Sequence, residues 1–219
     1  MMLLLRLVLG LASLACAGDF RPRVIECNIP AISLGSTLVR TVEVNAGRYR
    51  VNGLPAADLG SGNSKDVVLH PQDSDMVVKV FHGRFLPSLS EKRLDQASIA
   101  LLAPSRLTPR LVEQGAVSVG GKAQGYIVQE KVAGLDLERP TPSKLAEVRK
   151  LFDKLVKARL EVVDGERPAK MRANIMVGET KSDGWGAYLV DPDVVKSERS
   201  EKELRAFYDG VYAGIVSGR

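Results

Sequence analysis

Residues 59–69 read Leu-Gly-Ser-Gly-Asn-Ser-Lys-Asp-Val-Val-Leu, and this stretch decides how the chain is interpreted. Its alternating and β-branched residues predict a strand, a turn at Gly60-Ser61-Gly62 and a second strand. Because glycine has no Cβ, the backbone of such a turn can lie against phosphate oxygens with bare N–H groups as donors. Plain hairpin turns use the same Gly-x-Gly, so the turn alone leaves both interpretations open.

A lysine inside the next apolar strand favours a binding site. The turn over 71–75 closes a hairpin, and Met76–Phe81 continues the sheet with Lys79 between valines. A cation in such a strand is costly unless it has a partner. A nucleotide phosphate together with a helix carboxylate would be a suitable partner. The alternative is that Lys79 faces solvent on an edge strand.

The neighbouring segments complete an antiparallel sheet with one helix. Apolar residues at helical spacing, including Leu94, predict a helix over 91–102 that Pro104 stops. Gly120-Gly121 predicts a tight turn between two strands. The expected strands, besides the three already named, lie over 42–54, 110–113, 117–119 and 125–130.

The second half of the chain predicts helices with two short strands between them. Ser143 is the expected N-cap of a helix over 144–160. A polar loop is expected over 164–173 and a last helix over 201–216. Strands are expected over 174–177 and 187–190, so that Asn174 and Asp191 lie at strand ends. Asn and Asp oxygens beside phosphate and water suit Mg²⁺; the alternative roles are turn residue and helix cap.

The order of these elements resembles a protein kinase. Gly60-x-Gly62-x-x-Lys65-x-Val67 follows the glycine loop of that family, except that Lys65 stands where a third glycine is usual. Residues 129–134 resemble the hinge, and Asp191-Pro192-Asp193 takes the place of Asp-Phe-Gly. With 28 residues after Asp191, the chain looks closest to minimal bacterial effector kinases, the Hop-class type III effectors that phosphorylate a host heat-shock chaperone.

This resemblance implies a fold and a set of roles. The fold is α+β and protein-kinase-like, with a five-stranded antiparallel N-lobe sheet and one helix over 42–132 and a truncated, mainly helical C-lobe over 133–219. The cofactors are ATP and Mg²⁺. Lys79 holds the α/β-phosphates and pairs with an acid on the following helix, for which Asp95 is the first choice and Glu91 the second. Nucleotide-binding positions are Gly60, Gly62, Lys65, Val67, Lys79, Asp95, Glu130 and Val132, and the metal ligands are Asn174 and Asp191.

The catalytic base is the gap in the resemblance. The family places an Asp five residues before the metal-binding Asn, and here that position is Ala169. If the preceding loop carries an insertion, Asp164 reaches the substrate hydroxyl, and the catalytic set is Asp164, Lys79 and Asp191. If it does not, the chain is a pseudokinase that acts as a nucleotide- or protein-binding module. A secreted α+β domain with accidental motifs is the third interpretation.

The N-terminus predicts export. An apolar stretch broken by Arg6 ends in Ala15-Cys16-Ala17, which resembles a signal-peptidase site. It is too short to span a bilayer comfortably. Residues 1–17 are therefore expected to be a cleaved signal, with an extended lead-in over 18–41; a lipoprotein anchor and a wrongly chosen start codon are the alternatives. The expected location is the periplasm or a host cell.

Composition limits the partners. A net charge of +5 without a long Lys/Arg run, and 5% aromatic residues, give no footprint for nucleic acid. The only histidines are His70 and His82 and no cysteine pair accompanies them, which excludes a structural zinc site. We therefore expect a monomer whose partner is a protein substrate, with no stable membrane insertion once the signal is removed.

Overall fold

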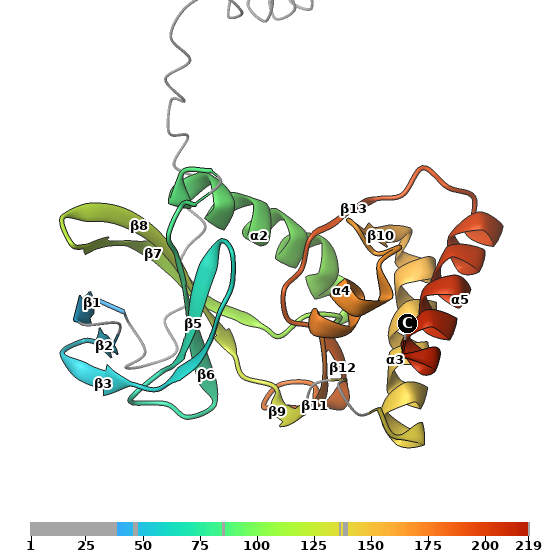
Figure 1. Ribbon diagram of the computed structural model, residues 1–219, viewed down its shortest axis with the longest axis horizontal. Helices are drawn as coiled ribbons and strands as arrows, with labels where there is room; N and C mark the ends of the chain where they lie inside the picture. Colours follow the sequence, from blue (N-terminus) through green and yellow to red (C-terminus); the bar gives the residue numbers. More distant parts are fainter. Residues whose placement is uncertain (1–38, 46–47, 85, 136, 138–139, 219) are drawn as a thin grey trace, which may run out of the picture. The chain divides into compact units, whose positions relative to one another are not determined.

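The computed structural model describes residues 39–45, 48–84, 86–135, 137 and 140–218 (Figure 1). All of them belong to one compact unit, residues 31–219. The expected signal over 1–17 and most of the expected lead-in over 18–41 lie outside the described residues.

A five-stranded antiparallel sheet is the first main element, as expected. Its strand order is β4-β5-β6-β8-β7. The strands are β4 (Asp58–Ser61), β5 (Lys65–Leu69), β6 (Met76–Phe81), β7 (Leu111–Val119) and β8 (Lys122–Glu130). The two short strands expected over 110–119 are one continuous strand, β7, because its pairing with β8 runs through the whole segment.

The turns of this sheet follow from local chemistry. Gly120 and Gly121 join β7 to β8 with φ of 57° and 77°, a backbone conformation in which a Cβ would be strained. Between β5 and β6, Asp75 N donates to Asp73 Oδ1, so the aspartate side chain replaces a turn hydrogen bond. Both predicted turns are confirmed.

A second, three-stranded sheet precedes the first in the chain. It has the order β1-β2-β3, with β1 (Val42–Asn45), β2 (Arg48–Val51) and β3 (Leu54–Ala56). Val42 and Val51 are buried in one cluster with Val68, Val80 and Val128 of the five-stranded sheet. Alternation along each strand points these valines into a shared core.

Helix α2 (Ser88–Leu102) packs on the five-stranded sheet, where Ile99 meets Phe81 and Ile127. It begins three residues earlier than expected, and Leu94, expected on its apolar face, is 59% exposed. The buried positions instead include the polar residues Glu91 and Asp95. The helix therefore turns a polar edge toward the site described below.

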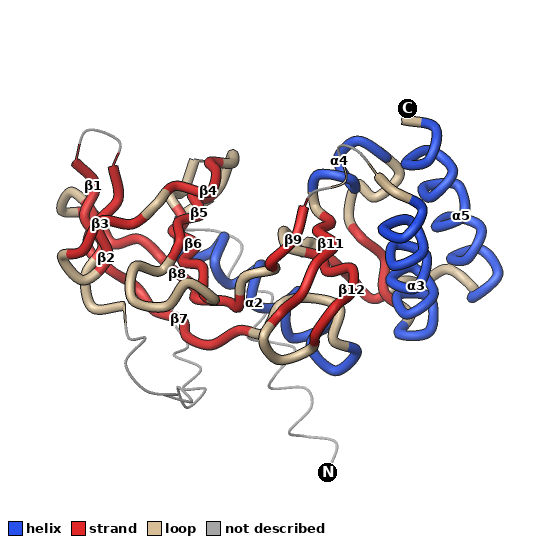
Figure 2. The backbone as a smooth tube through the Cα atoms, turned by 90° about the horizontal axis from the view of Figure 1, so that it is seen from below, coloured by secondary structure: helices blue, strands red, loops and turns tan. Residues whose placement is uncertain are grey.

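The rest of the described chain mixes strands and helices. A three-stranded sheet has the order β12-β11-β9, and β10 pairs with β13. The elements are η1 (Ala103–Ser105), β9 (Ala133–Leu135), α3 (Pro142–Ala158), β10 (Leu160–Val162), α4 (Pro168–Ala173), β11 (Ile175–Thr180), β12 (Gly184–Leu189), β13 (Val194–Lys196) and α5 (Glu201–Ser217). Figure 2 shows α3 and α5 side by side, next to the strands of the β12-β11-β9 sheet.

These helices share one core around stacked aromatic rings. Phe152 of α3 and Tyr208 of α5 lie 4.9 Å apart between ring centroids, and the Tyr208 hydroxyl donates to Leu160 O. Burying such rings contributes most of the packing energy between two amphipathic helices.

Two expectations for this half are wrong in detail. The N-cap of α3 is Thr141 and not Ser143, because the Thr141 hydroxyl accepts from Lys144 N and Pro142 fits the first helical turn. The expected loop over 164–173 contains helix α4, whose Pro168 packs against Gly214 of α5. No helix among the described residues is long and apolar enough to cross a membrane.

Candidate functional site

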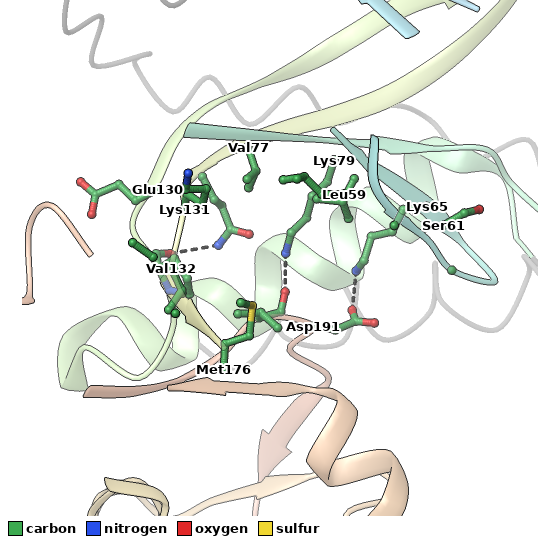
Figure 3. Close-up of a pocket in the computed structure, with 18 residues that line it drawn as sticks. Leu59, Ser61, Lys65, Val77, Lys79, Glu130, Lys131, Val132, Met176 and Asp191 are labelled. Atoms are coloured by element: carbon green, nitrogen blue, oxygen red, sulfur yellow. Dashed lines mark hydrogen bonds and ion pairs between the residues drawn. The ribbon is translucent and has the colours of Figure 1, made fainter. Parts of the chain in front are cut away.

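A cavity of about 600 Å³ lies between the five-stranded sheet and the β12-β11-β9 sheet (Figure 3). One part of its wall is apolar and includes Val67, Val77, Val132 and Met176. The other part carries charge: Lys65, Lys79 and Asp191 line it beside the glycine turn. Most of the residues that the sequence singled out therefore meet in one place.

The glycine turn lines the cavity but keeps its amides occupied. Gly60 has a φ of 154°, and a Cβ at this position would meet no atom within 4 Å, so a ligand can approach its backbone. However, Gly60 N donates to Asp58 Oδ1 at 2.9 Å, and Gly62 N donates to Lys65 O at 2.9 Å. The expectation of bare glycine N–H groups is wrong, because the turn already satisfies these two donors. Binding an anion here falls mainly to the lysines.

Lys65 forms the central ion pair of the site. Its Nζ lies 2.8 Å from each carboxylate oxygen of Asp95 and 2.5 Å from Asp191 Oδ1, and it stands over the Phe81 ring. Burial lowers the pKa of Lys65, but the Asp95 and Asp191 carboxylates together raise it above its ordinary value. The expected pairing of Asp95 with Lys79 is thus wrong: the lysine on β5, not the one on β6, reaches the acid on α2.

Lys79 is buried beside this pair without joining it. Its Nζ donates to Val190 O, and it forms no ion pair with any residue that the structure describes. Burial, and then the positive charge of Lys65, lower the pKa of Lys79 to about 8. The alternative that Lys79 faces solvent is wrong, because 4% of the residue is exposed.

Asp191 connects the lysines to the next strand end. Burial raises the pKa of its carboxyl group, but Lys65 and Lys79 outweigh burial and hold the pKa below its ordinary range. The carboxylate is therefore ionised at neutral pH. Its side chain is 54% exposed, so a ligand in the cavity can reach it.

The apolar end is bounded by the segment that follows β8. The Glu130 carboxylate points away from the cavity, as Figure 3 shows, and accepts hydrogen bonds from Ser182 N and Oγ. Glu130 and Val132 both line the cavity, and Glu130 N already donates to Arg110 O at 3.0 Å. Gln129, which the sequence did not single out, lines the same wall and donates from Nε2 to Pro109 O at 3.0 Å.

A second cavity of about 230 Å³ adjoins the first through Lys65 and Asp191, which line both. Asn174 and Asp193 line it as well, together with Lys170 of α4. Leu94 and Val163, both partly exposed, form its apolar rim. The backbone fixes Asn174 beside the strand end that carries Asp191, since Val190 N donates to Asn174 O.

Asp164, the expected base, lies near this second cavity but does not line it. Its φ is 56°, and its carboxylate accepts from Lys170 Nζ. The hydrogen bond from Lys170 holds the pKa of Asp164 below its ordinary range. Helix α4 lies between Asp164 and Asn174.

The oxygen donors fit Mg²⁺ in kind, since Asn174 and Asp191 offer an amide and a carboxylate at adjoining strand ends. Within the described part of the chain, no group of three or more His, Cys, Asp or Glu is placed to hold a metal ion. Asn174 and Asp191 supply two ligands only, so a Mg²⁺ ion held by them would take its further ligands from phosphate oxygens.

Sequence reasoning missed Lys170, Asp193 and the role of Lys65 as the partner of Asp95. A signal for Lys65 was present: it stands two residues from Val67 on one strand, as Lys79 stands two residues from Val77 on the next. Side chains two apart share a face, so each lysine lies on the face of its neighbouring valine, and the register of β5 against β6 brings the two faces together. Nothing local in the sequence pointed to Lys170.

Known proteins do not help to assign this site. No model of a known protein family matches the chain, and no curated protein sequence matches it either. What the site does has to follow from its own residues.

Proposed function

We propose that the chain binds ATP in the larger cavity and transfers its terminal phosphoryl group to a hydroxyl of a protein substrate. One observation carries this proposal: the cavity combines an apolar end with a charged end that holds two buried lysines and an ionised carboxylate. A ligand with a flat apolar base and an anionic tail matches both ends. The order of the elements along the chain supports a protein-kinase-like fold around this cavity.

The reaction would proceed by positioning more than by covalent chemistry. The bond between the γ-phosphorus and the oxygen that bridges it to the β-phosphate breaks, and a new bond forms between that phosphorus and the acceptor hydroxyl oxygen. The hydroxyl proton passes to a carboxylate, for which Asp164 is our choice, and ADP leaves. Asn174 and Asp191 would hold Mg²⁺, which neutralises phosphate charge when bound.

A second candidate is a nucleotide-binding module that does not transfer phosphate. It is favoured by Ala169 at the expected base position and by the pairing of Asp164 with Lys170, which ties up the substitute base. The acceptor protein, a host heat-shock chaperone, is a proposal that rests on the sequence resemblance alone. The secreted location is a proposal that rests on the N-terminal signal pattern.

The proposal predicts that Mg-ATP stabilises the protein. At a hundred times its dissociation constant, a ligand raises the free energy of unfolding by about 2.7 kcal/mol. We expect a higher melting temperature with Mg-ATP for the wild type and a much smaller rise for Asp191→Asn, measured by differential scanning fluorimetry. Asp209→Asn is the matched control, because Asp209 pairs with Arg149 outside both cavities and should keep the wild-type rise.

Phosphoryl transfer separates the two candidates. With γ-labelled ATP and a panel of host chaperones or a generic protein substrate, the wild type and Asp209→Asn should label the acceptor, and Asp191→Asn and Asp164→Asn should not. A melting-temperature rise without any labelling would replace the kinase with the binding module. No rise with Mg-ATP would reject both.

A further inference from the structure

Two lysines on neighbouring strands line one cavity, but only one of them forms ion pairs with carboxylates. Lys65 pairs with Phe81 in the strand register and Lys79 pairs with Val67, so both side chains leave the same face of the sheet two residues apart. Both are about 5% exposed or less and both line the larger cavity. Figure 3 shows the two side chains extending in the same direction.

Lys65 is already neutralised. One ammonium group faces two carboxylates, Asp95 on α2 and Asp191 at the end of the β12 segment. The Asp95 contact is bidentate and lies at the buried edge of the helix, where breaking it would leave an unpaired charge. Lys65 thus joins β5, α2 and Asp191, and has little charge left for an incoming anion.

The ammonium charge of Lys79, in contrast, is not neutralised by a carboxylate in contact with it. Its one hydrogen-bond partner among the described residues is the carbonyl oxygen of Val190. A buried ammonium without a carboxylate partner is destabilising, and an anion placed beside it offsets that cost. The nearest positive neighbour, Lys65, adds to the attraction for an anion and gives Lys79 no compensation of its own.

We propose that the two tasks which the resemblance assigns to one lysine are divided here: Lys65 positions α2 and Asp191, and Lys79 receives the anionic phosphates of the ligand. The assignment of phosphates to Lys79 rests on the proposed function, whereas the Lys65–Asp95 coupling does not. Lys65 is a positioning residue, and Lys79 is the residue that touches the ligand.

The coupling is tested by unfolding without any ligand. Lys65→Met and Asp95→Asn should each lower the melting temperature, and the double variant should be lowered by much less than the sum, because each single change already breaks the pair. Lys79→Met combined with Asp95→Asn should depart from additivity by less than the Lys65 pair does, because Asp95 acts on Lys79 through its charge and makes no contact with it. If Lys79→Met proves the more strongly non-additive partner of Asp95→Asn, the division of tasks is overturned.

Ligand binding tests the second task. We expect Lys79→Met to weaken binding of ATP and of pyrophosphate by about tenfold or more while adenosine binding changes little, measured by calorimetry in EDTA so that no metal contributes. Lys92→Met is the matched control: Lys92 is also partly buried, and its Nζ donates to the carbonyl of Gly115, outside the cavity. It should leave all three affinities unchanged.

The outcomes also separate this inference from the proposed function. Binding of pyrophosphate without binding of ATP or adenosine would reject the nucleotide site but keep Lys79 as the anion-binding residue. An equal loss for ATP and adenosine in Lys79→Met would overturn the role of Lys79, as would a selective loss of ATP in Lys65→Met and not in Lys79→Met. A wild type that binds neither pyrophosphate nor ATP would overturn it too.

Discussion

At the scale of the residue, burial changes the protonation of Lys79 at moderately alkaline pH. Its pKa is about 8 in the folded chain and near 10.4 in an unfolded chain. Between these values the unfolded state holds more protons, so the free energy of unfolding rises as the pH rises. We expect the wild type to gain stability relative to Lys79→Met between pH 8 and 10, by at most about 1.4 kcal/mol per pH unit, in urea titrations.

A lysine in a favourable ion pair would make the free energy of unfolding fall as the pH rises. Lys79 has the opposite effect, because its protonated form is the one that destabilises the fold. Burial raises the pKa of Tyr49, Tyr126 and Tyr208, which lowers stability as the pH approaches 10, but wild type and Lys79→Met share these tyrosines and their contribution cancels in the difference. Lys122→Met, which replaces an exposed lysine on β8, should behave as the wild type. A stability difference between wild type and Lys79→Met that stays flat across this range would contradict the assignment.

At the scale of elements, the pairing of β9 with β11 depends on two glycines that face each other. Gly134 and Gly178 are register partners, and a Cβ at Gly178 would lie 2.6 Å from Ala133 O. Backbone cannot move away as a flexible side chain would, so Gly178→Ala should lower the free energy of unfolding by about 1–3 kcal/mol. Chemical denaturation measures this change.

A glycine in a helix serves as the matched control for that substitution. Gly210 lies in α5, and a Cβ there meets nothing within 4 Å. Gly210→Ala should therefore stabilise the chain by about 0.5–1 kcal/mol, because alanine is the better helix former. Equal effects at Gly178 and Gly210 would show that close backbone approach does not control the β9–β11 pairing.

At the scale of the whole described chain, buried hydrogen bonds tie α2 and the segment that follows it to the core around the Phe152 and Tyr208 rings. Leu189 N donates to Leu107 O, the Thr108 hydroxyl donates to Leu189 O, and Val194 N donates to Ser98 Oγ. We expect one cooperative unfolding transition, with the fluorescence intensity of Trp185 and far-UV circular dichroism changing together. Trp185 is the only tryptophan and lies on β12 with 59% of the residue exposed, so its fluorescence reports on the unfolding of that strand.

Thr108→Val removes one of these ties. It should lower the free energy of unfolding by about 1 kcal/mol and keep a single transition. Separate transitions for the two probes in the wild type would mean that the cores unfold independently and that the cavity between the sheets opens before the chain unfolds.

The sequence by itself determined the strands and turns of the five-stranded sheet and brought Gly60, Lys79, Asn174 and Asp191 forward as site residues, because alternation and turn chemistry are local properties. Only the tertiary structure decided which lysine meets Asp95. That choice depends on the register of β5 against β6 and on the face that α2 presents to Lys65, which lies 30 residues before Asp95. It also decided that Thr141 caps α3 and that Lys170 on an unexpected helix reaches Asp164. Both contacts are local, but helix α4 itself packs through Pro168 against Gly214 of α5, a distant partner that leaves no mark in the local pattern.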